Sequence, residues 1–139
     1  MTAVIVLAVP KAVISDLSSP CRAHGLDFIS LIAPTSEHRI AAIAREAEGF
    51  LYLVSSLGVT GTRSEITTDL SSIVNAVREN TQIPCAIGFG ISTPEQAGQM
   101  AQLADGVIVG SAIVKLLEQY GTQAPQHIAA YVKSMKEAM

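Results

Sequence analysis

The most constraining feature of this sequence is a regular alternation between short apolar runs and segments in which apolar residues recur at helical spacing. The runs are continuously apolar, which is typical of parallel strands covered on both faces. They lie at 4–7, 28–32, 50–54, 83–87 and 106–109. The intervening patterns predict helices at 12–24, 40–47 and 70–77, a helix starting at Thr93, and helices at 113–120 and 128–135. Parallel strands need such crossovers, so the sequence predicts an α/β fold of about five βα units of parallel sheet.

The length and composition restrict this fold further. The chain has 139 residues, which suits one domain over 1–139 with a core of its own. A complete (β/α)8 barrel typically needs about 250 residues, so the chain is too short for one. Charged residues make up 15% of the chain and hydrophobic residues 49%, which argues against disorder. The net charge of −3 gives no basic footprint, and nucleic-acid binding is disfavoured.

The cysteines and the first residues bear on the compartment. Cys21 and Cys85 are far apart and lack metal-ligand spacing, so neither a disulfide framework nor a metal site is expected. The apolar start is too short to span a bilayer, and its first cation, Lys11, follows the apolar run rather than preceding it. We therefore expect a cytoplasmic protein that does not enter membranes.

Glycine clusters follow three of the predicted strands, at 58–61, 88–90 and 110–112. Glycine lets a ligand approach the backbone closely, and the N–H groups that open a helix attract anions. Gly110 and Ser111 stand directly between the last strand and a predicted helix, which is the arrangement of a phosphate seat. The spacing of the glycine clusters alone is equally compatible with two interpretations, a phosphate-binding site and a set of ordinary turns.

Other polar residues have structural interpretations. His24 precedes Gly25 at a predicted helix end, where it caps the helix dipole. Tyr52 lies within a strand as a core residue, although its hydroxyl can reach the carboxyl end of the sheet. Glu65 and Asp69 are interpreted as loop and helix-cap carboxylates. None of the predicted strands carries a carboxylate in its second half, which argues against acid–base chemistry there.

Three long segments of the sequence are LVSSLGVTG at 53–61, IGFGISTPEQ at 87–96 and ADGVIVGSAIV at 104–114. Together these segments resemble the tryptophan synthase alpha subunit. They occur in the family's order and spacing, and the resemblance runs from about Val4 to the end of the chain.

The resemblance implies that the chain corresponds to strands four to eight of a TIM-type (β/α)8 barrel. The family, which takes part in tryptophan biosynthesis, is a carbon–carbon lyase without a cofactor of its own. It cleaves indole-3-glycerol phosphate by a retro-aldol reaction to indole and glyceraldehyde 3-phosphate, and indole passes to a beta subunit. By resemblance, the phosphate-binding residues are Gly61, Gly90, Gly110 and Ser111, and the substrate-binding residues are Tyr52, Thr60 and Phe89.

Two departures from the family pattern bear on activity. The catalytic carboxylates of the family lie on its second strand and the loop after it, which would precede residue 1, so no catalytic residue is assigned here. Ala8 stands where the family has an aspartate before Val9-Pro10, and Ala12 and Val13 replace acidic residues. We therefore expect a phosphorylated substrate to bind with little or no lyase activity from the chain alone. Pairing with a beta subunit is implied by the family and is weakened by Ala8.

Two further interpretations stay open. Five strands leave two sheet edges unpaired, so the chain is alternatively a non-catalytic interaction module that self-associates or pairs with a partner subunit or a complementary barrel fragment. The chain is also compatible with being part of a longer enzyme, in which case the coding DNA upstream of Met1 continues in frame.

Overall fold

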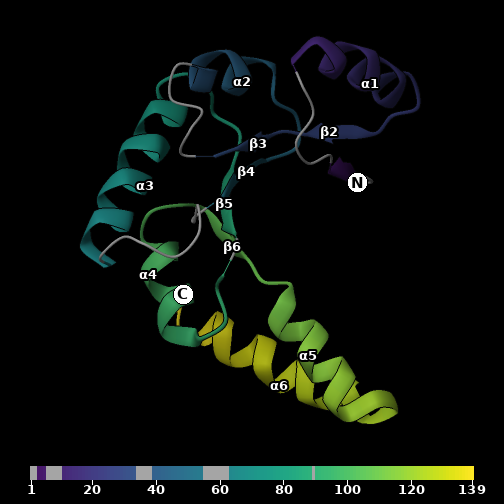
Figure 1. The fold of residues 1–139 in the computed structure, drawn as a ribbon, viewed down its shortest axis with the longest axis vertical. Helices are drawn as coiled ribbons and strands as arrows, with labels where there is room; N and C mark the ends of the chain where they lie inside the picture. The colour runs from purple at the N-terminus through teal and green to yellow at the C-terminus, as the bar shows by residue number, and fades with distance from the viewer. Residues whose placement is uncertain (1–2, 6–10, 34–38, 55–62, 89) are drawn as a thin grey trace.

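A computed structural model describes residues 3–5, 11–33, 39–54, 63–88 and 90–139 (Figure 1). The strands are β1 (Ala3–Ile5), β2 (Asp27–Ile29), β3 (Leu31–Ile32), β4 (Leu51–Val54), β5 (Cys85–Gly88) and β6 (Gly106–Ile108). The helices are α1 (Lys11–Ala23), α2 (Ile40–Glu46), α3 (Arg63–Arg78), α4 (Pro94–Ala101), α5 (Ser111–Tyr120), the short 3₁₀ helix η2 (Gly121–Gln123) and α6 (Ala124–Glu137).

The strands pair in chain order and every pairing is parallel. β1 pairs with β2, and β3, β4, β5 and β6 form a sheet in that order. Only Ser30 separates β2 from β3, and its carbonyl accepts a hydrogen bond from the N–H of Tyr52 at 3.0 Å. The two short strands therefore correspond to the single predicted run 28–32. The prediction of an α/β fold built from about five parallel βα units is confirmed.

The two faces of the β3–β6 sheet have different surroundings. On the outer face, Leu51, Leu53 and Ile87 belong to the main hydrophobic core together with Val74 and Val77 of α3. In Figure 1, α2, α3 and α4 all lie on this side of the strands. The alternation of side chains turns a second set of strand residues to the inner face. By register these inner residues are Leu31, Tyr52, Ala86 and Gly106 in one row and Val54, Gly88 and Ile108 in the next.

The predicted helices are present, and two of them begin well before the predicted position. α3 begins at Arg63 and α6 at Ala124, against expected starts at residues 70 and 128. The polar stretch before Leu70 has the composition of a loop, but the helix continues through it. The capping box expected at Thr93 and Gln96 is confirmed in both of its hydrogen bonds. None of the described helices is long and apolar enough to cross a membrane.

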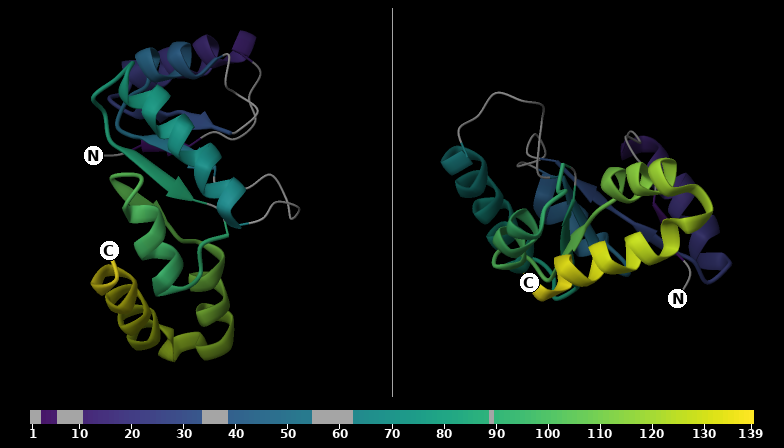
Figure 2. Two further views of the ribbon diagram at one scale, coloured as in Figure 1. Left: turned by 90° about the vertical axis from the view of Figure 1, so that its left-hand side faces the viewer. Right: turned by 90° about the horizontal axis from the view of Figure 1, so that it is seen from below.

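The apolar residues that recur at helical spacing predict a helix face buried in the core, and α5 departs from this prediction. Leu117 is 55% exposed and Val114 53%, and α5 has no buried residue. Val132 of α6, expected in a core stripe, is also exposed, whereas Ala124 and Met135 of that helix are buried. The two helices form a pair that extends from the end of β6, as Figure 2 shows, so α5 packs mainly against α6. A helix covered on one side only leaves part of its apolar surface in solvent.

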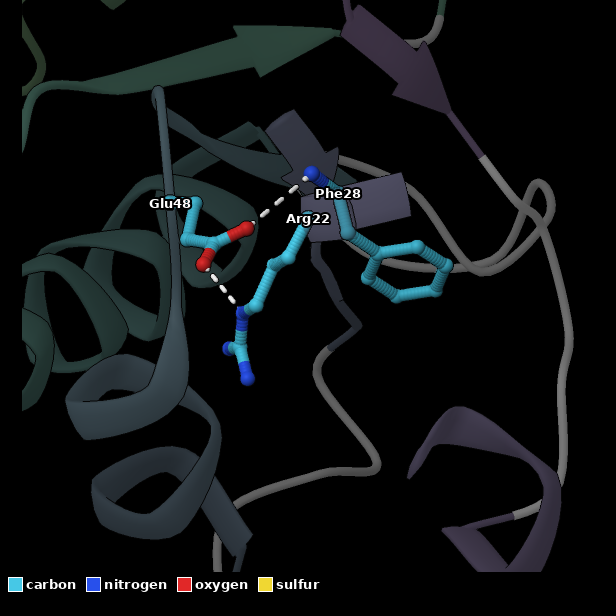
Figure 3. A network of polar contacts seen from close by, with 3 residues as sticks. All are labelled: Arg22, Phe28 and Glu48. Carbon is cyan, nitrogen blue, oxygen red and sulfur yellow. Dashed lines mark hydrogen bonds and ion pairs between the residues drawn. The ribbon is translucent and has the colours of Figure 1, made fainter. Parts of the chain in front are cut away.

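Polar side chains join neighbouring elements where the strands begin, at the edge called here the start rim. Glu48, which precedes β4, accepts hydrogen bonds from the Arg22 guanidinium of α1 and, at 3.4 Å, from the N–H of Phe28 in β2 (Figure 3). The hydrogen bond from Arg22 is the largest influence on the carboxyl and lowers the pKa of Glu48. This network therefore ties α1, β2 and the segment before β4 together.

A second network lies at the same rim, one strand further along. Asp105 precedes β6, and its Oδ2 accepts a hydrogen bond of 2.9 Å from the N–H of Cys85, the first residue of β5. The N–H of Asp105 in turn donates to the carbonyl of Cys85 at 2.9 Å. The bond from the Cys85 N–H is the main cause that lowers the pKa of Asp105, and burial raises the pKa of the Cys85 thiol. Through these two hydrogen bonds, Asp105 holds the start of β6 beside the start of β5.

Candidate functional site

The side chain of Tyr52 extends from β4 to the last residue of β5. A Cβ atom placed on Gly88 would lie 2.6 Å from Cζ and 2.9 Å from Cε1 of Tyr52. Such separations are far shorter than van der Waals contact, so the phenol ring lies directly over the backbone of Gly88. The hydroxyl of Tyr52 therefore reaches the edge where the strands end, called here the end rim, as its strand position suggested. Among the seven inner-face residues, only Tyr52 carries a polar side-chain atom.

The turn from β5 into α4 contains a glycine with a positive φ and, after it, the capping box at the start of α4. Gly90 has a φ of +78°, a left-handed conformation that residues with a Cβ rarely adopt. The side-chain oxygen of Gln96 accepts hydrogen bonds from the N–H groups of Ser92, at 2.8 Å, and Thr93, at 3.2 Å. Those two N–H groups are consequently occupied within the protein.

The N-terminus of α4 already carries its own negative charge. Glu95 lies in the first turn, and bonds from its own backbone N–H and from the Thr93 hydroxyl lower its pKa. A carboxylate at this end of a helix interacts favourably with the helix dipole. With its capping box and this carboxylate, the start of α4 has no need of an external anion.

The N-terminus of α5 has a different composition. Gly110 occupies the N-cap without any side-chain cap hydrogen bond, and the first turn contains no acidic residue. Ser111 is the first residue of the helix and is exposed. The first N–H groups of a helix lack partners within the helix, and together they favour a bound anion. The start of α5 therefore has neither a side-chain cap nor an acidic residue at the place where the Gly110-Ser111 pair predicts a phosphate site, and phosphate binding there stays a prediction.

The two turns leave from adjacent strand ends at the end rim. Gly88 of β5 is paired with Ile108 of β6, and Gly90 and Gly110 each follow their strand residue by two positions. A Cβ on Gly110 would meet nothing within 4 Å, which leaves open space beside the helix start.

The structure brings together four of the seven residues assigned from the sequence. Tyr52, Gly90, Gly110 and Ser111 all lie at or point to the end rim of β4, β5 and β6. The other three, Thr60, Gly61 and Phe89, fall outside the described residues. The ligand roles of all seven remain predictions. Within the part of the chain that the structure describes, no cluster of His, Cys, Asp or Glu could hold a metal ion.

Sequence reasoning missed two residues that shape this rim. Gly88 was grouped with Gly90 as a turn glycine, whereas it ends β5 and makes room for the Tyr52 ring. Tyr131 packs against the core as its helical spacing predicts, but its hydroxyl also donates a hydrogen bond of 2.9 Å to the carbonyl of Ser92. Both contacts join residues far apart in the chain, so no local signal in the sequence reveals them.

Comparisons with known proteins agree on one family. The tryptophan synthase alpha chain model matches residues 1–139. The alpha chain of Geobacter sulfurreducens is 46% identical over 138 residues, covering 98% of this chain and 52% of the relative, and that of Lactiplantibacillus plantarum is 55% identical over 117 residues, covering 84% and 44%. Tryptophan synthase subunit alpha from Campylobacter jejuni superposes with a TM-score of 0.81 at 32% identity, covering 99% of this chain and 52% of that structure. This chain thus spans about half the length of the relatives it matches.

Proposed function

The chain belongs to the tryptophan synthase alpha chain family, and we propose that these 139 residues carry the phosphate-binding half of that family's active site. The observation that supports this is the uncapped start of α5 beside the Gly90 turn. The ligands are indole-3-glycerol phosphate and its product glyceraldehyde 3-phosphate. Gly61, Gly90, Gly110 and Ser111 contact the phosphate, and Tyr52, Thr60 and Phe89 contact the rest of the substrate.

The expected activity of these 139 residues follows from the same assignment. The resemblance places the catalytic carboxylates of the family on segments that have no counterpart in this sequence. General acid–base catalysis contributes about 10²–10⁴-fold per positioned group, so the chain by itself should release indole at a negligible rate. Turnover of indole-3-glycerol phosphate comparable to that of a complete alpha chain contradicts this proposal.

Phosphate binding is tested by titrating the ¹⁵N-labelled chain with inorganic phosphate and then with glyceraldehyde 3-phosphate. We expect the amide signals of Gly90, Gly110 and Ser111 to move, and those of the self-capped start of α4 to move less. Ser111→Asp places a fixed negative charge at the start of α5, which should abolish binding while leaving the helix stable.

The matched control is Thr122→Asp, which adds the same charge at an exposed position just before α6. It should bind phosphate as the unmodified chain does. Equal loss of binding in the two variants indicates a general effect of net charge and contradicts a seat at α5.

The partner and compartment of this chain are part of the same proposal. The family implies a beta subunit as partner and the cytoplasm as location. Ala8, which stands in place of the family's aspartate, should weaken communication with that partner. Restoring the acid by Ala8→Asp should then raise the affinity for a beta subunit in a co-sedimentation assay, with Ala129→Asp at an exposed position on α6 as the control for added charge.

A second function is favoured by the exposed face of α5. Val114 and Leu117 of this helix are more than half exposed, and among the described strands β6 pairs with β5 alone. Exposed apolar patches and free strand edges are typical of association surfaces. We propose as the alternative that two copies of this chain associate through this side. Sedimentation velocity over a range of micromolar concentrations tests it, and a monomer at every concentration contradicts it.

A further inference from the structure

Tyr131 of α6 reaches across to the turn that precedes α4. Its hydroxyl donates a hydrogen bond of 2.9 Å to the carbonyl of Ser92, 39 residues earlier in the chain. The ring is partly buried against the main hydrophobic core, and this burial raises the pKa of Tyr131. The ring of Tyr131 therefore packs against the core, while its hydroxyl makes one hydrogen bond to the Ser92 carbonyl.

This contact and the capping box act on the same peptide group. The carbonyl of Ser92 and the N–H of Thr93 belong to one planar unit and point in opposite directions. Tyr131 binds the carbonyl end, while the side-chain oxygen of Gln96 accepts from the N–H end at 3.2 Å. The plane is thus fixed from both sides. Ile91, just before it, is 7% exposed and packs in the core.

Helix α6 is itself firmly placed. A Cβ atom on Gly98 of α4 would lie 2.5 Å from the carbonyl oxygen of Ala138, so the end of α6 lies directly on α4. At its other end, the ring of His127 stacks on that of Tyr120 in α5, with centroids 3.6 Å apart and planes 10° from parallel. α6 consequently contacts both helices whose N-termini follow the glycine turns, and Tyr131 lies between these two contacts.

We propose that Tyr131 is a positioning residue for the phosphate site, acting through the Ser92 carbonyl to hold the turn that carries Gly90. The proposal rests on the proposed function for its effect on ligand affinity. Its effect on the turn does not depend on a ligand. The side chain is not expected to touch the phosphate, because its hydroxyl is already bound to the far end of the turn.

The test compares Tyr131→Phe, which removes only the hydroxyl, with the matched control Tyr120→Phe in α5, whose ring stacks on His127 near the start of α6. Hydrogen exchange in the ligand-free chain is measured at the N–H groups of Ser92 and Thr93. A single hydrogen bond contributes about 1 kcal/mol, so we expect exchange there to accelerate roughly threefold to tenfold in Tyr131→Phe alone. The dissociation constant for glyceraldehyde 3-phosphate should rise by a similar factor, with little change in the Tm.

The outcomes separate this proposal from the function on which it rests. Unchanged exchange at Ser92 and Thr93 in Tyr131→Phe overturns the positioning role. Faster exchange with an unchanged dissociation constant would show that the Tyr131 hydroxyl stabilises only the local turn. That result also overturns the positioning role for the phosphate site. If the unmodified chain binds neither phosphate nor glyceraldehyde 3-phosphate, the proposed function and the affinity effect fail together, while the exchange result alone decides whether Tyr131 holds the turn.

Discussion

At the scale of single residues, the packing of Tyr52 over Gly88 is the contact on which the inner face depends most. The two residues come from adjacent strands, and the ring occupies the space that any side chain at Gly88 would need. Glycine at this position is therefore a requirement of packing. At Gly90 it is a requirement of the backbone, where φ is positive and the space beside Cα is open.

Gly88→Ala should destabilise the chain by about 1–3 kcal/mol, because the added methyl overpacks against the Tyr52 ring. Gly106→Ala is the matched control on the same inner face: its Cβ would be 3.9 Å from that of Ala86, an ordinary contact. Urea unfolding of both variants measures the difference. In a Tyr52→Leu background, the cost of Gly88→Ala should fall close to zero. An unchanged cost in that background contradicts the assigned contact.

The residue scale also shows where sequence reasoning ends. The capping box at Thr93 and Gln96 was predictable because its residues are three apart and obey a local rule. The reasons for Gly88 and for the hydroxyl of Tyr131 depend on partners 36 and 39 positions away. Such partners are known only once the strand register and helix packing are known.

At the scale of elements, most boundaries could be predicted because apolar periodicity reports burial. The prediction was wrong for Leu117, since periodicity shows that a helix has an apolar face but not that another element covers it. The interruption at Ser30 was also not predicted, because an apolar run does not reveal where hydrogen bonding changes from one sheet to another.

The contact between α1 and the segment before β4 predicts a pH dependence of stability. The pKa of Glu48 lies below its ordinary value of 4.5, so its ion pair with Arg22 contributes to stability above that pH. The contribution is lost as the pH falls through the lowered pKa. Since the Glu48 side chain is 27% exposed and that of Arg22 52%, the contribution should be about 1 kcal/mol or less.

Glu48→Gln tests this dependence, with Glu118→Gln at an exposed site on α5 as the control. Urea unfolding over a pH series should show the Glu48→Gln variant less stable near neutral pH and equal to the unmodified chain in acid. A constant difference at all pH values would show that the loss comes from packing and not from the charge.

At the scale of the whole molecule, the chain is a sector of a barrel with one face open. Its outer face is covered by α2, α3 and α4, whereas Tyr52, Val54, Ala86 and Ile108 on the inner face are only partly buried (Figure 1). The composition predicts this open face in outline. A low content of charged residues indicates more apolar surface than five βα units can bury. The composition could not show that α5 would carry Leu117, the most exposed of the large apolar residues that the structure describes.

Leu117→Lys should reduce self-association of the chain, if two copies associate through α5, without lowering its stability. The side chain is more than half exposed, so its replacement should change the free energy of unfolding by no more than about 0.5 kcal/mol. Ala129→Lys, at an exposed position on α6, adds the same charge elsewhere. Sedimentation velocity should show a lower average mass for Leu117→Lys only, and equal masses for both variants contradict an interface on α5.

The placement of the polar networks at the start rim, away from the glycine turns at the end rim, has a consequence for how this chain can change. Substitutions around Glu48 or Asp105 alter the stability of the scaffold without reaching the turns at Gly90 and Gly110. If the turns bind phosphate as proposed, substitutions in them should alter ligand binding and leave the networks intact. The stability of the scaffold and ligand binding at the turns can therefore evolve, or be engineered, separately in this chain.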